Sequence, residues 1–294
     1  MTTSIFQVLE KLGLTSKQSR VLYNDKTRDV ENLKVWKDIN SGVIYIDEFY
    51  TGDETYIEGA YREDEAFELK KLRPDYERNT DAQRRLKSNL KFVAGKKIAD
   101  FGCGSGDFLK LVQPHCNEVI GIELQQNYVD ELNAAGVPCT NNLDTIKDGS
   151  LDIVFLFHVL EHLPNPLETL SDLMQKVESG GHILIEVPHA NDLLLSAVDC
   201  DNFKQFTLWS QHLVLHTRES LSKTLKSVGL EDIQIEGVQR YPLSNHLNWL
   251  SNGKPGGHKS PLSSLDSDAL VDAYQNSLAR IDATDTLVAT AKVS

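Results

Sequence analysis

Short apolar runs alternate with amphipathic stretches from Lys97 to about Val238. The apolar runs read KIADFG, EVIGIE, DIVFLF and HILIEV, and their nearly continuous hydrophobicity predicts strands that are buried on both faces. The stretches DFLKLV, QNYVDELNAAG, PLETLSDLMQKVESG and TRESLSKTLKSVG have helical spacing of apolar residues. This alternation predicts an α/β fold, with a mostly parallel sheet that is covered by helices on both faces.

Glycines mark the expected ends of three of these helices. They are Gly136, Gly180 and Gly229, where a left-handed residue would close the last turn. A further helix, DAQRRLKSNLKF, is predicted from Asp81 and leads into the first strand at Lys97.

The two flanks of this core have other patterns. Residues 1–80 are polar and rich in aromatics, with a turn at DINSG between the extended pieces LKVWK and VIYID and with helix and loop elsewhere. After the strand EDIQIEGVQ, residues 239–284 hold a loop-like stretch, YPLSNHLNWLSNGKPGGHKSPL, and the helix SDALVDAYQNSLARI. DTLVATAKV predicts a last strand. We therefore expect a lid or substrate-side module at 1–80, a core at 81–238, a substrate-recognition insertion at 239–284 and a terminal core strand at 285–294.

Composition and charge narrow the class of protein. The 294 residues are 40% hydrophobic and 25% charged, and the formal net charge of -13 argues against binding to nucleic acid or an anionic membrane. The four cysteines form no C-x-x-C pair, so we expect neither a zinc site of that kind nor a disulfide framework. The N-terminal stretch does not resemble a secretory signal, and no apolar run approaches the roughly 20 residues of a membrane span. We expect a cytoplasmic protein.

A glycine-rich loop follows the first core strand. In IADFGCGSGDFLKLV, glycines occupy positions 102, 104 and 106, which predicts that a ligand approaches the main chain closely. A P-loop would need a lysine and a hydroxyl that are absent here, and a dinucleotide fingerprint has G-x-G-x-x-G spacing. Asp107 at the start of the helix would repel a pyrophosphate, although aspartate is also a common helix cap. A tight turn without a ligand is the simpler alternative.

Glu123 ends the next strand, about 20 residues after the loop, where an acid binds ribose hydroxyls in nucleotide-binding folds. A solvated acid at a strand end is the alternative. Together the two features predict a nucleoside without pyrophosphate, and S-adenosylmethionine, with its adenosine, amino-acid tail and sulfonium cation, matches.

DFGCGSG, GIE and DIVFLFHVLEHLPNP together resemble the class I S-adenosylmethionine-dependent methyltransferases, and among them a bacterial subgroup with an E-H-x-x-x-P segment that includes sugar and small-molecule methyltransferases. The resemblance implies a Rossmann-like sheet of seven strands whose last strand is antiparallel, with the cofactor at the carboxyl ends of the strands. It also implies the cofactor-binding residues. These are Asp100, Gly102, Cys103, Gly104 and Gly106 around the methionine end, Glu123 and Leu124 at the ribose, Asn142 and Leu143 near the adenine, and Phe157 and His158 on the methyl-transfer face.

The segment HVLEH places His158 and His162 four residues apart, a spacing that binds metal on some helices. A metalloprotease helix has glutamate directly after the first histidine, whereas Glu161 here precedes the second, and no third ligand is obvious. We therefore expect no metal, and a structural role for His212 and His216. Glu161 and His162 are instead candidate catalytic residues, because a carboxylate beside a histidine can orient a general base. The resemblance to sugar C-methyltransferases favours this role, and the alternative is that the pair shapes the site.

The candidate substrate-binding residues are Tyr56, Tyr61, Arg84, His189, His246, Lys254 and His258. Aromatic, amide and basic groups suit a polar small molecule, a nucleotide-linked or polysaccharide-precursor sugar above all. Structured surface loops and core packing are the alternatives for these residues. Two other functions stay open at this point: an NAD-dependent oxidoreductase and a noncatalytic module that binds S-adenosylmethionine.

Overall fold

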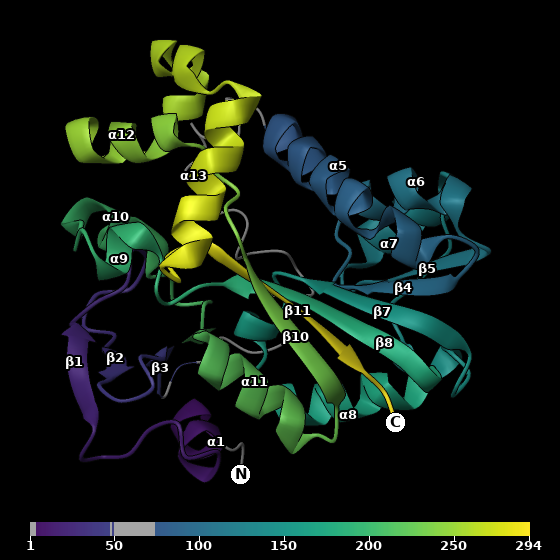
Figure 1. The fold of residues 1–294 in the computed structure, drawn as a ribbon. Coiled ribbons are helices and arrows are strands. Elements are labelled where there is room, and N and C mark those ends of the chain that lie inside the picture. Colours follow the sequence, from purple (N-terminus) through teal and green to yellow (C-terminus); the bar gives the residue numbers. More distant parts are fainter. Residues whose placement is uncertain (1–3, 48, 50–73) are drawn as a thin grey trace.

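The computed structural model describes residues 4–47, 49 and 74–294 (Figure 1). Its main sheet has seven strands in the order β10-β11-β8-β7-β4-β5-β6. The neighbours from β8 to β6 are parallel, and β11 is antiparallel to both β8 and β10. The strands are β4 (Lys97–Phe101), β5 (Glu118–Ile122), β6 (Cys139–Thr140), β7 (Leu151–Phe157), β8 (Val177–Pro188), β10 (Glu231–Val238) and β11 (Thr286–Lys292). This topology confirms the predicted Rossmann-like sheet with its antiparallel last strand.

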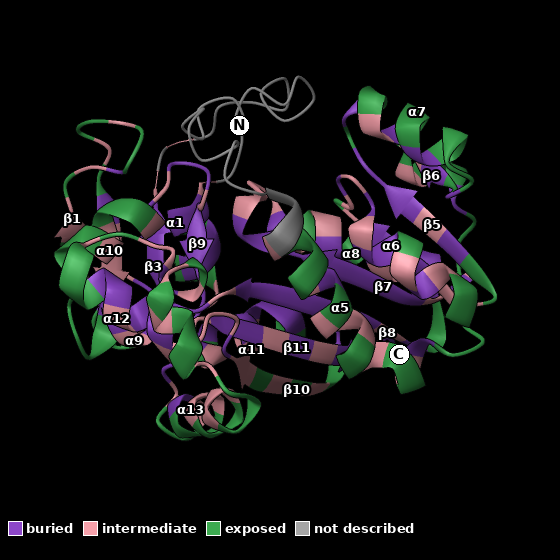
Figure 2. Cartoon of the chain, turned by 90° about the horizontal axis from the view of Figure 1, so that it is seen from above, coloured by how far each residue is buried: buried purple, intermediate pink, exposed green. Residues whose placement is uncertain are grey.

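Helices cover both faces of this sheet, as predicted. On one face lie α5 (Pro74–Val93), α6 (Asp107–Val112) and α7 (Gln126–Ala134), and on the other lie α8 (Pro166–Lys176) and α11 (Arg218–Ser227) (Figure 1). Each face of the sheet packs into its own hydrophobic core. On β4, Ile98 points into the core with α5–α7, and its neighbour Ala99 points into the core with α8 and α11. Seen from above, the central strands of the main sheet are largely buried, whereas β10 at its edge is half-exposed or exposed (Figure 2). The continuous apolar runs reflect this burial on both faces.

A second, antiparallel sheet joins the N-terminal segment to the middle of the chain. Its order is β1-β2-β3-β9, with β1 (Arg20–Asn24), β2 (Val35–Asp38), β3 (Ile44–Ile46) and β9 (Val214–Leu215), and α1 (Ile5–Lys11) packs against it. The predicted turn between β2 and β3 is confirmed, because the Asp38 carboxylate accepts hydrogen bonds from the N–H groups of Asn40 and Ser41. The strand β1 was not predicted. Its residues are half-exposed or exposed and carry no clear alternation.

The C-terminal insertion is more helical than its sequence predicts. The stretch that we expect to be loop-like contains α12 (Leu243–Asn252) and the 3-10 helices η4 (Gly257–Lys259) and η5 (Pro261–Leu265), while α13 (Asp268–Arg280) is confirmed. The buried side of α12 carries the polar residues Ser244, Asn245, His246 and Asn248, so the apolar spacing that identifies a helix is weak. The remaining elements are α9 (Leu193–Ser196), α10 (Asp201–Thr207), η1 (Gln113–His115), η2 (Leu143–Thr145) and η3 (Leu160–His162).

The helix boundaries follow the predicted glycines in two cases of three. Gly136 and Gly229, at φ +78° and +93°, directly follow Ala135 and Val228, the residues that cap α7 and α11. The prediction for Gly180 is wrong, since α8 ends at Lys176 and Val177 already has extended backbone, so Gly180 lies within β8. The helix α5 begins at Pro74, earlier than predicted. Within the described residues, no helix has the length and apolarity to span a membrane.

Candidate active site

The glycine loop between β4 and α6 has a backbone that other residues could not adopt easily. Gly102, Gly104 and Gly106 have φ values of +74°, +54° and +68°, in the left-handed region. A Cβ atom at Gly102 would lie 2.6 Å from a methyl of Val159, and one at Gly106 would lie 2.5 Å from a methyl of Leu132. The loop therefore needs glycine both for its conformation and for its close packing.

Glu123 is fixed against this loop. It is buried at the end of β5, and its Oε2 accepts a hydrogen bond of 2.8 Å from the N–H of Gly104. Its Oε1 accepts one of 3.0 Å from the N–H of Gln125, just before α7. The side-chain nitrogen of Gln125 is itself buried without a hydrogen-bond partner among the described residues. The fixed carboxylate can accept hydrogen bonds from hydroxyl groups of a ligand, and the unpaired amide nitrogen can donate one to an acceptor. A ribose offers both kinds of group.

Asp100 provides a second buried acid at the end of the neighbouring strand, β4. Burial raises its pKa to about 7, Arg85 opposes this rise, and the carboxylates of Glu123 and Glu186 add to it. A cation would therefore be attracted to this position, because it would relieve the repulsion among the acids. Asp107 serves the loop differently: at the start of α6 it accepts a hydrogen bond from Ser105 Oγ at 2.8 Å, and it lies 3.5 Å from Arg78.

Phe157 is the last residue of β7, and His158 follows it directly beside this site. The Phe157 ring packs edge-to-face on Phe108, and the Arg85 guanidinium lies 4.2 Å from its centre. His158 has φ +56°, and its Nδ1 and Nε2 lie 3.2 Å and 3.1 Å from carboxylate oxygens of Glu161 and Glu186. Burial and Arg240 lower the pKa of His158, but these two carboxylates outweigh them and raise it above the ordinary value.

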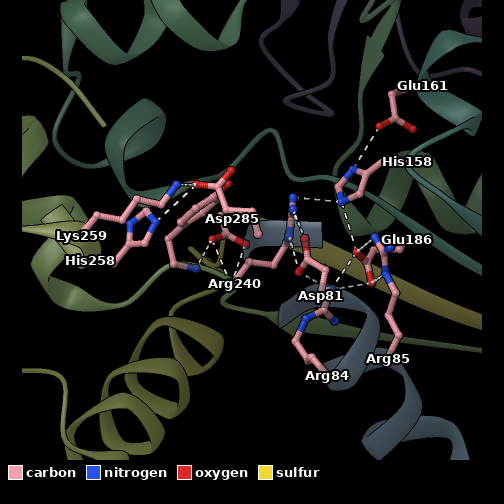
Figure 3. Close-up of polar contacts among 12 residues, drawn as sticks. Asp81, Arg84, Arg85, His158, Glu161, Glu186, Arg240, His258, Lys259 and Asp285 are labelled. Atoms are coloured by element: carbon pink, nitrogen blue, oxygen red, sulfur yellow. Dashed lines mark hydrogen bonds and ion pairs between the residues drawn. The ribbon is translucent and has the colours of Figure 1, made fainter. Parts of the chain in front are cut away.

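A charged network connects α5 to the carboxyl ends of the strands (Figure 3). Arg84 and Arg85 donate hydrogen bonds to Glu186 on β8 at 2.9 Å and 2.7 Å. Arg240, just after β10, pairs with Asp81 on α5 and lies 3.1 Å from Nε2 of His158. Arg84 and His158 were among the residues expected at the site, whereas Asp81, Arg85, Glu186 and Arg240 were not. An acid inside the apolar run HILIEV was the available signal, since a buried carboxylate needs a partner.

The candidate catalytic pair has two separate sets of contacts. Glu161 is fully buried, and its Oε1 faces Nδ1 of His158, whereas Nδ1 of His162 lies 2.7 Å from the carbonyl oxygen of Gln211. HVLEH does not form one α-helix, because His158 is left-handed and the 3-10 helix η3 follows it. Spacing along the chain paired His158 with His162, but the structure brings together a different set: ligand atoms of Glu161, His162 and His212 lie within 4.8 Å of one another.

The residues expected near the ribose and adenine lie at the ends of β5 and β6. Leu124 is 48% exposed beside Glu123, and Leu143 is half-buried at the start of η2. Asn142 caps η2, because its side chain accepts a hydrogen bond from the N–H of Asp144. Cys103 belongs to the glycine loop, and its sulfur lies 3.9 Å from that of Cys139. The cofactor-binding roles of these four residues therefore stay predictions.

The expected substrate-binding residues are dispersed. Tyr56 and Tyr61 fall outside the described residues. His189 and His246 are buried in internal contacts, with Nδ1 2.9 Å from the carbonyl oxygen of Thr284 and 2.6 Å from the hydroxyl of Tyr274. Arg84 belongs to the network around Glu186. Lys254 is exposed after α12, and His258 on η4 lies 3.3 Å from Glu77 of α5.

Comparisons with known proteins agree on the class of enzyme. The model of a methyltransferase-domain family matches residues 75–235. The ubiquinone biosynthesis O-methyltransferases of Ralstonia nicotianae and Cupriavidus pinatubonensis are 28% and 25% identical over 166 residues, which cover 52% of this chain and 70% and 67% of those proteins. A crystal structure of an S-adenosylmethionine-dependent methyltransferase from Archaeoglobus fulgidus has a similar fold, with a TM-score of 0.51, 19% identity, and coverage of 73% of this chain and 94% of that one.

The residues present fit S-adenosylmethionine, which supplies an electrophilic methyl group on a positively charged sulfur. The glycine cradle admits close approach, Glu123 offers a held carboxylate, and Asp100 sits in a cluster of acids that attracts a cation. The matches do not favour the alternatives of an oxidoreductase or a noncatalytic module. The chain belongs to this methyltransferase-domain family and is an S-adenosylmethionine-dependent methyltransferase.

Proposed function

We propose that this methyltransferase acts on a small polar acceptor, a nucleotide-linked or polysaccharide-precursor sugar, at one of its oxygen or carbon atoms. The supporting observation is the charged lining next to His158, formed by α5 and the residues after β10. Arg240 pairs there with Asp81, and Glu77 lies 2.7 Å from Lys259 and 3.3 Å from His258 (Figure 3). An anionic acceptor can replace Glu77 as the partner of Lys259 and His258.

For the cofactor, we propose that Arg85 binds the carboxylate of the methionine end and Asp100 its ammonium group. Arg85 lies over Phe157, pairs with Glu186 and interacts electrostatically with Asp100, which lies on β4 just before the glycine loop. Glu123 would accept hydrogen bonds from the ribose hydroxyls. Cys103, Leu124, Asn142 and Leu143 would line the remaining cofactor surface. Methyl transfer then needs alignment of the acceptor with the methyl group, which Phe157 and His158 would provide.

The predicted role of His162 as general base stays a prediction. The carbonyl of Gln211 accepts a hydrogen bond from Nδ1–H of His162 in the neutral tautomer, which places the basic lone pair on Nε2. Glu161 is held by His158, so any orienting effect of Glu161 on His162 would act through space.

The relatives' name favours oxygen as the acceptor atom, and the charged lining favours a sugar over an apolar acceptor. A methyl-transfer screen with radiolabelled cofactor would compare nucleotide sugars with phenols that carry polyprenyl chains. We expect turnover of a nucleotide sugar, and a rise of at least tenfold in its KM in Lys259→Ala with unchanged cofactor affinity. Lys226→Ala, on the distant α11, is the matched control. Turnover of the polyprenyl phenols alone would overturn the proposed acceptor class.

A further inference from the structure

Glu161, His162 and His212 form a cluster that combines two imidazoles with one carboxylate. Glu161 and His162 lie on η3 after β7, and His212 comes from the segment that leads into β9, some fifty residues later. The two segments are joined by the backbone, since the N–H of Leu213 donates a hydrogen bond of 2.8 Å to the carbonyl oxygen of Glu161. One ligand atom from each of the three side chains lies within 4.8 Å of the other two.

Two atoms of this cluster are buried without an assigned role. Among the described residues, neither Oε2 of Glu161 nor Nδ1 of His212 has a hydrogen-bond partner. Glu161 is 0% exposed, and leaving a carboxylate oxygen unsatisfied in such a place is costly. Native proteins rarely contain such groups unless a ligand, an ion or water satisfies them.

The surrounding contacts are those that metal-binding side chains need. The other carboxylate oxygen of Glu161 faces Nδ1 of His158 at 3.2 Å, and Nδ1 of His162 faces the Gln211 carbonyl oxygen at 2.7 Å. Such outer contacts fix the carboxylate and select the histidine tautomer, and they commonly accompany metal ligands. With these contacts made, Oε2 of Glu161 and Nε2 of His162 are the atoms of these two side chains that would bind an ion.

We propose that Glu161, His162 and His212 bind one divalent transition-metal ion, with Zn²⁺ as the best match. Two histidines and one glutamate suit zinc and leave a fourth position for water or an acceptor oxygen, whereas magnesium and calcium prefer sites made of oxygens. Ligand atoms of a zinc ion lie about 2 Å from it, so the three side chains need to close by about 1 Å. The proposal replaces the general-base role of His162, because one lone pair cannot serve both purposes.

Metal binding can be measured without cofactor or acceptor, so this proposal does not depend on the proposed function. The full chain would be treated with a chelator, then titrated with Zn²⁺ by calorimetry and with Co²⁺ by absorption spectroscopy. We expect one tight equivalent of Zn²⁺ and the visible bands of a four-coordinate Co²⁺ ion. Trp209 reports independently: its ring centre lies 5.8 Å from His162 and 5.3 Å from His212, so Co²⁺ should quench its fluorescence.

Glu161→Gln and His212→Gln keep the side-chain volume and should each weaken Zn²⁺ binding at least 100-fold, while His115→Gln, at an exposed histidine on η1, should not. Circular dichroism would show that the variants are folded. Equal Zn²⁺ affinity in wild type and both cluster variants would overturn the proposal, and so would a wild-type protein that binds no Zn²⁺ and gives no Co²⁺ bands. If a variant fails to fold, two measurements on the wild-type protein still test the proposal: the visible bands of bound Co²⁺ and the quenching of Trp209 fluorescence by Co²⁺. The Trp209→Phe variant should lack this quenching.

Discussion

The carboxylate of Glu123 accepts a hydrogen bond of 2.8 Å from the backbone N–H of Gly104. This contact joins the ends of two adjacent parallel strands, β4 and β5, and so ties the glycine loop to the predicted ribose-binding acid. The carboxylate is thereby held in place before any ligand arrives, which reduces the entropy lost on binding.

Glu123→Gln tests the role of this carboxylate. The amide keeps the shape but loses the charge that strengthens hydrogen bonds to ribose hydroxyls, worth about 1.5–3 kcal/mol for a charged acceptor. We expect the dissociation constant of S-adenosylhomocysteine to rise about tenfold or more, measured by calorimetry. Glu118→Gln, at the exposed start of the same strand, should leave it unchanged. Equal weakening in both variants would contradict the assignment.

Asp100 should make cofactor binding depend on pH. In the free protein its pKa is raised to about 7, first by burial, and a bound ammonium group requires the ionised carboxylate. Protonation of the free protein therefore competes with binding, and affinity should fall by up to about tenfold per pH unit below 7. Calorimetry between pH 5.5 and 8 measures this slope. Asp100→Asn should bind more weakly with a flatter profile, and an unchanged slope in this variant would reject the idea.

The pair of Asp81 and Arg240 should hold α5 against the strand ends. Both side chains are largely buried, at 14% and 21% exposure, so removal of one charge leaves the other with poor solvation. We expect Asp81→Asn to lower the free energy of unfolding by about 3 kcal/mol in urea titrations, and the double variant with Arg240→Gln to lose less than the sum of the single variants. Glu31→Gln, in the exposed pair with Lys26, is the control and should change little. Additive effects of Asp81→Asn and Arg240→Gln would show that the two residues do not interact.

Buried neutral histidines should destabilise the fold in mild acid. Burial lowers the pKa of His216 and of His246 to about 4, whereas an unfolded histidine titrates near 6.5. Between these values the unfolded chain binds protons that the folded chain does not. The free energy of unfolding should therefore fall as the pH drops from 6.5 to 4, by about 1.4 kcal/mol per pH unit for each histidine.

Urea unfolding at several pH values checks this window. His216→Gln should reduce the slope of the unfolding free energy against pH by the contribution of about one proton. His115→Gln, at an exposed histidine, should leave this slope unchanged. The hypothesis for His216 fails if its replacement leaves the slope unchanged.

Much of the fold was predictable because it is encoded locally. The apolar runs and the glycines at positions 102, 104 and 106 identified the sheet and the loop after β4, and both are present. The half-exposed β1 and the polar buried face of α12 were missed, because neither has the apolar periodicity on which such predictions rest. The glycine at 180 misled for a related reason: it lies in the left-handed region inside a strand, not at a helix end.

The site was less predictable, because its members meet through long-range packing. Two strong local signals, the glycine loop and Glu123, do lie together. The pairing of Glu161 with His158, the approach of His212 and the clamp of Arg85 on Glu186 depend on how η3, β9 and α5 are placed. Spacing along the chain does not determine those placements.

A calorimetric titration of the purified protein with S-adenosylhomocysteine, with NADH as a parallel control, tests the cofactor site most directly. We predict micromolar binding of the first compound, none of the second, and loss of binding in Gly104→Val, since a β-branched residue cannot readily adopt φ +54°. Binding of NADH without binding of S-adenosylhomocysteine would contradict the assignment of this site.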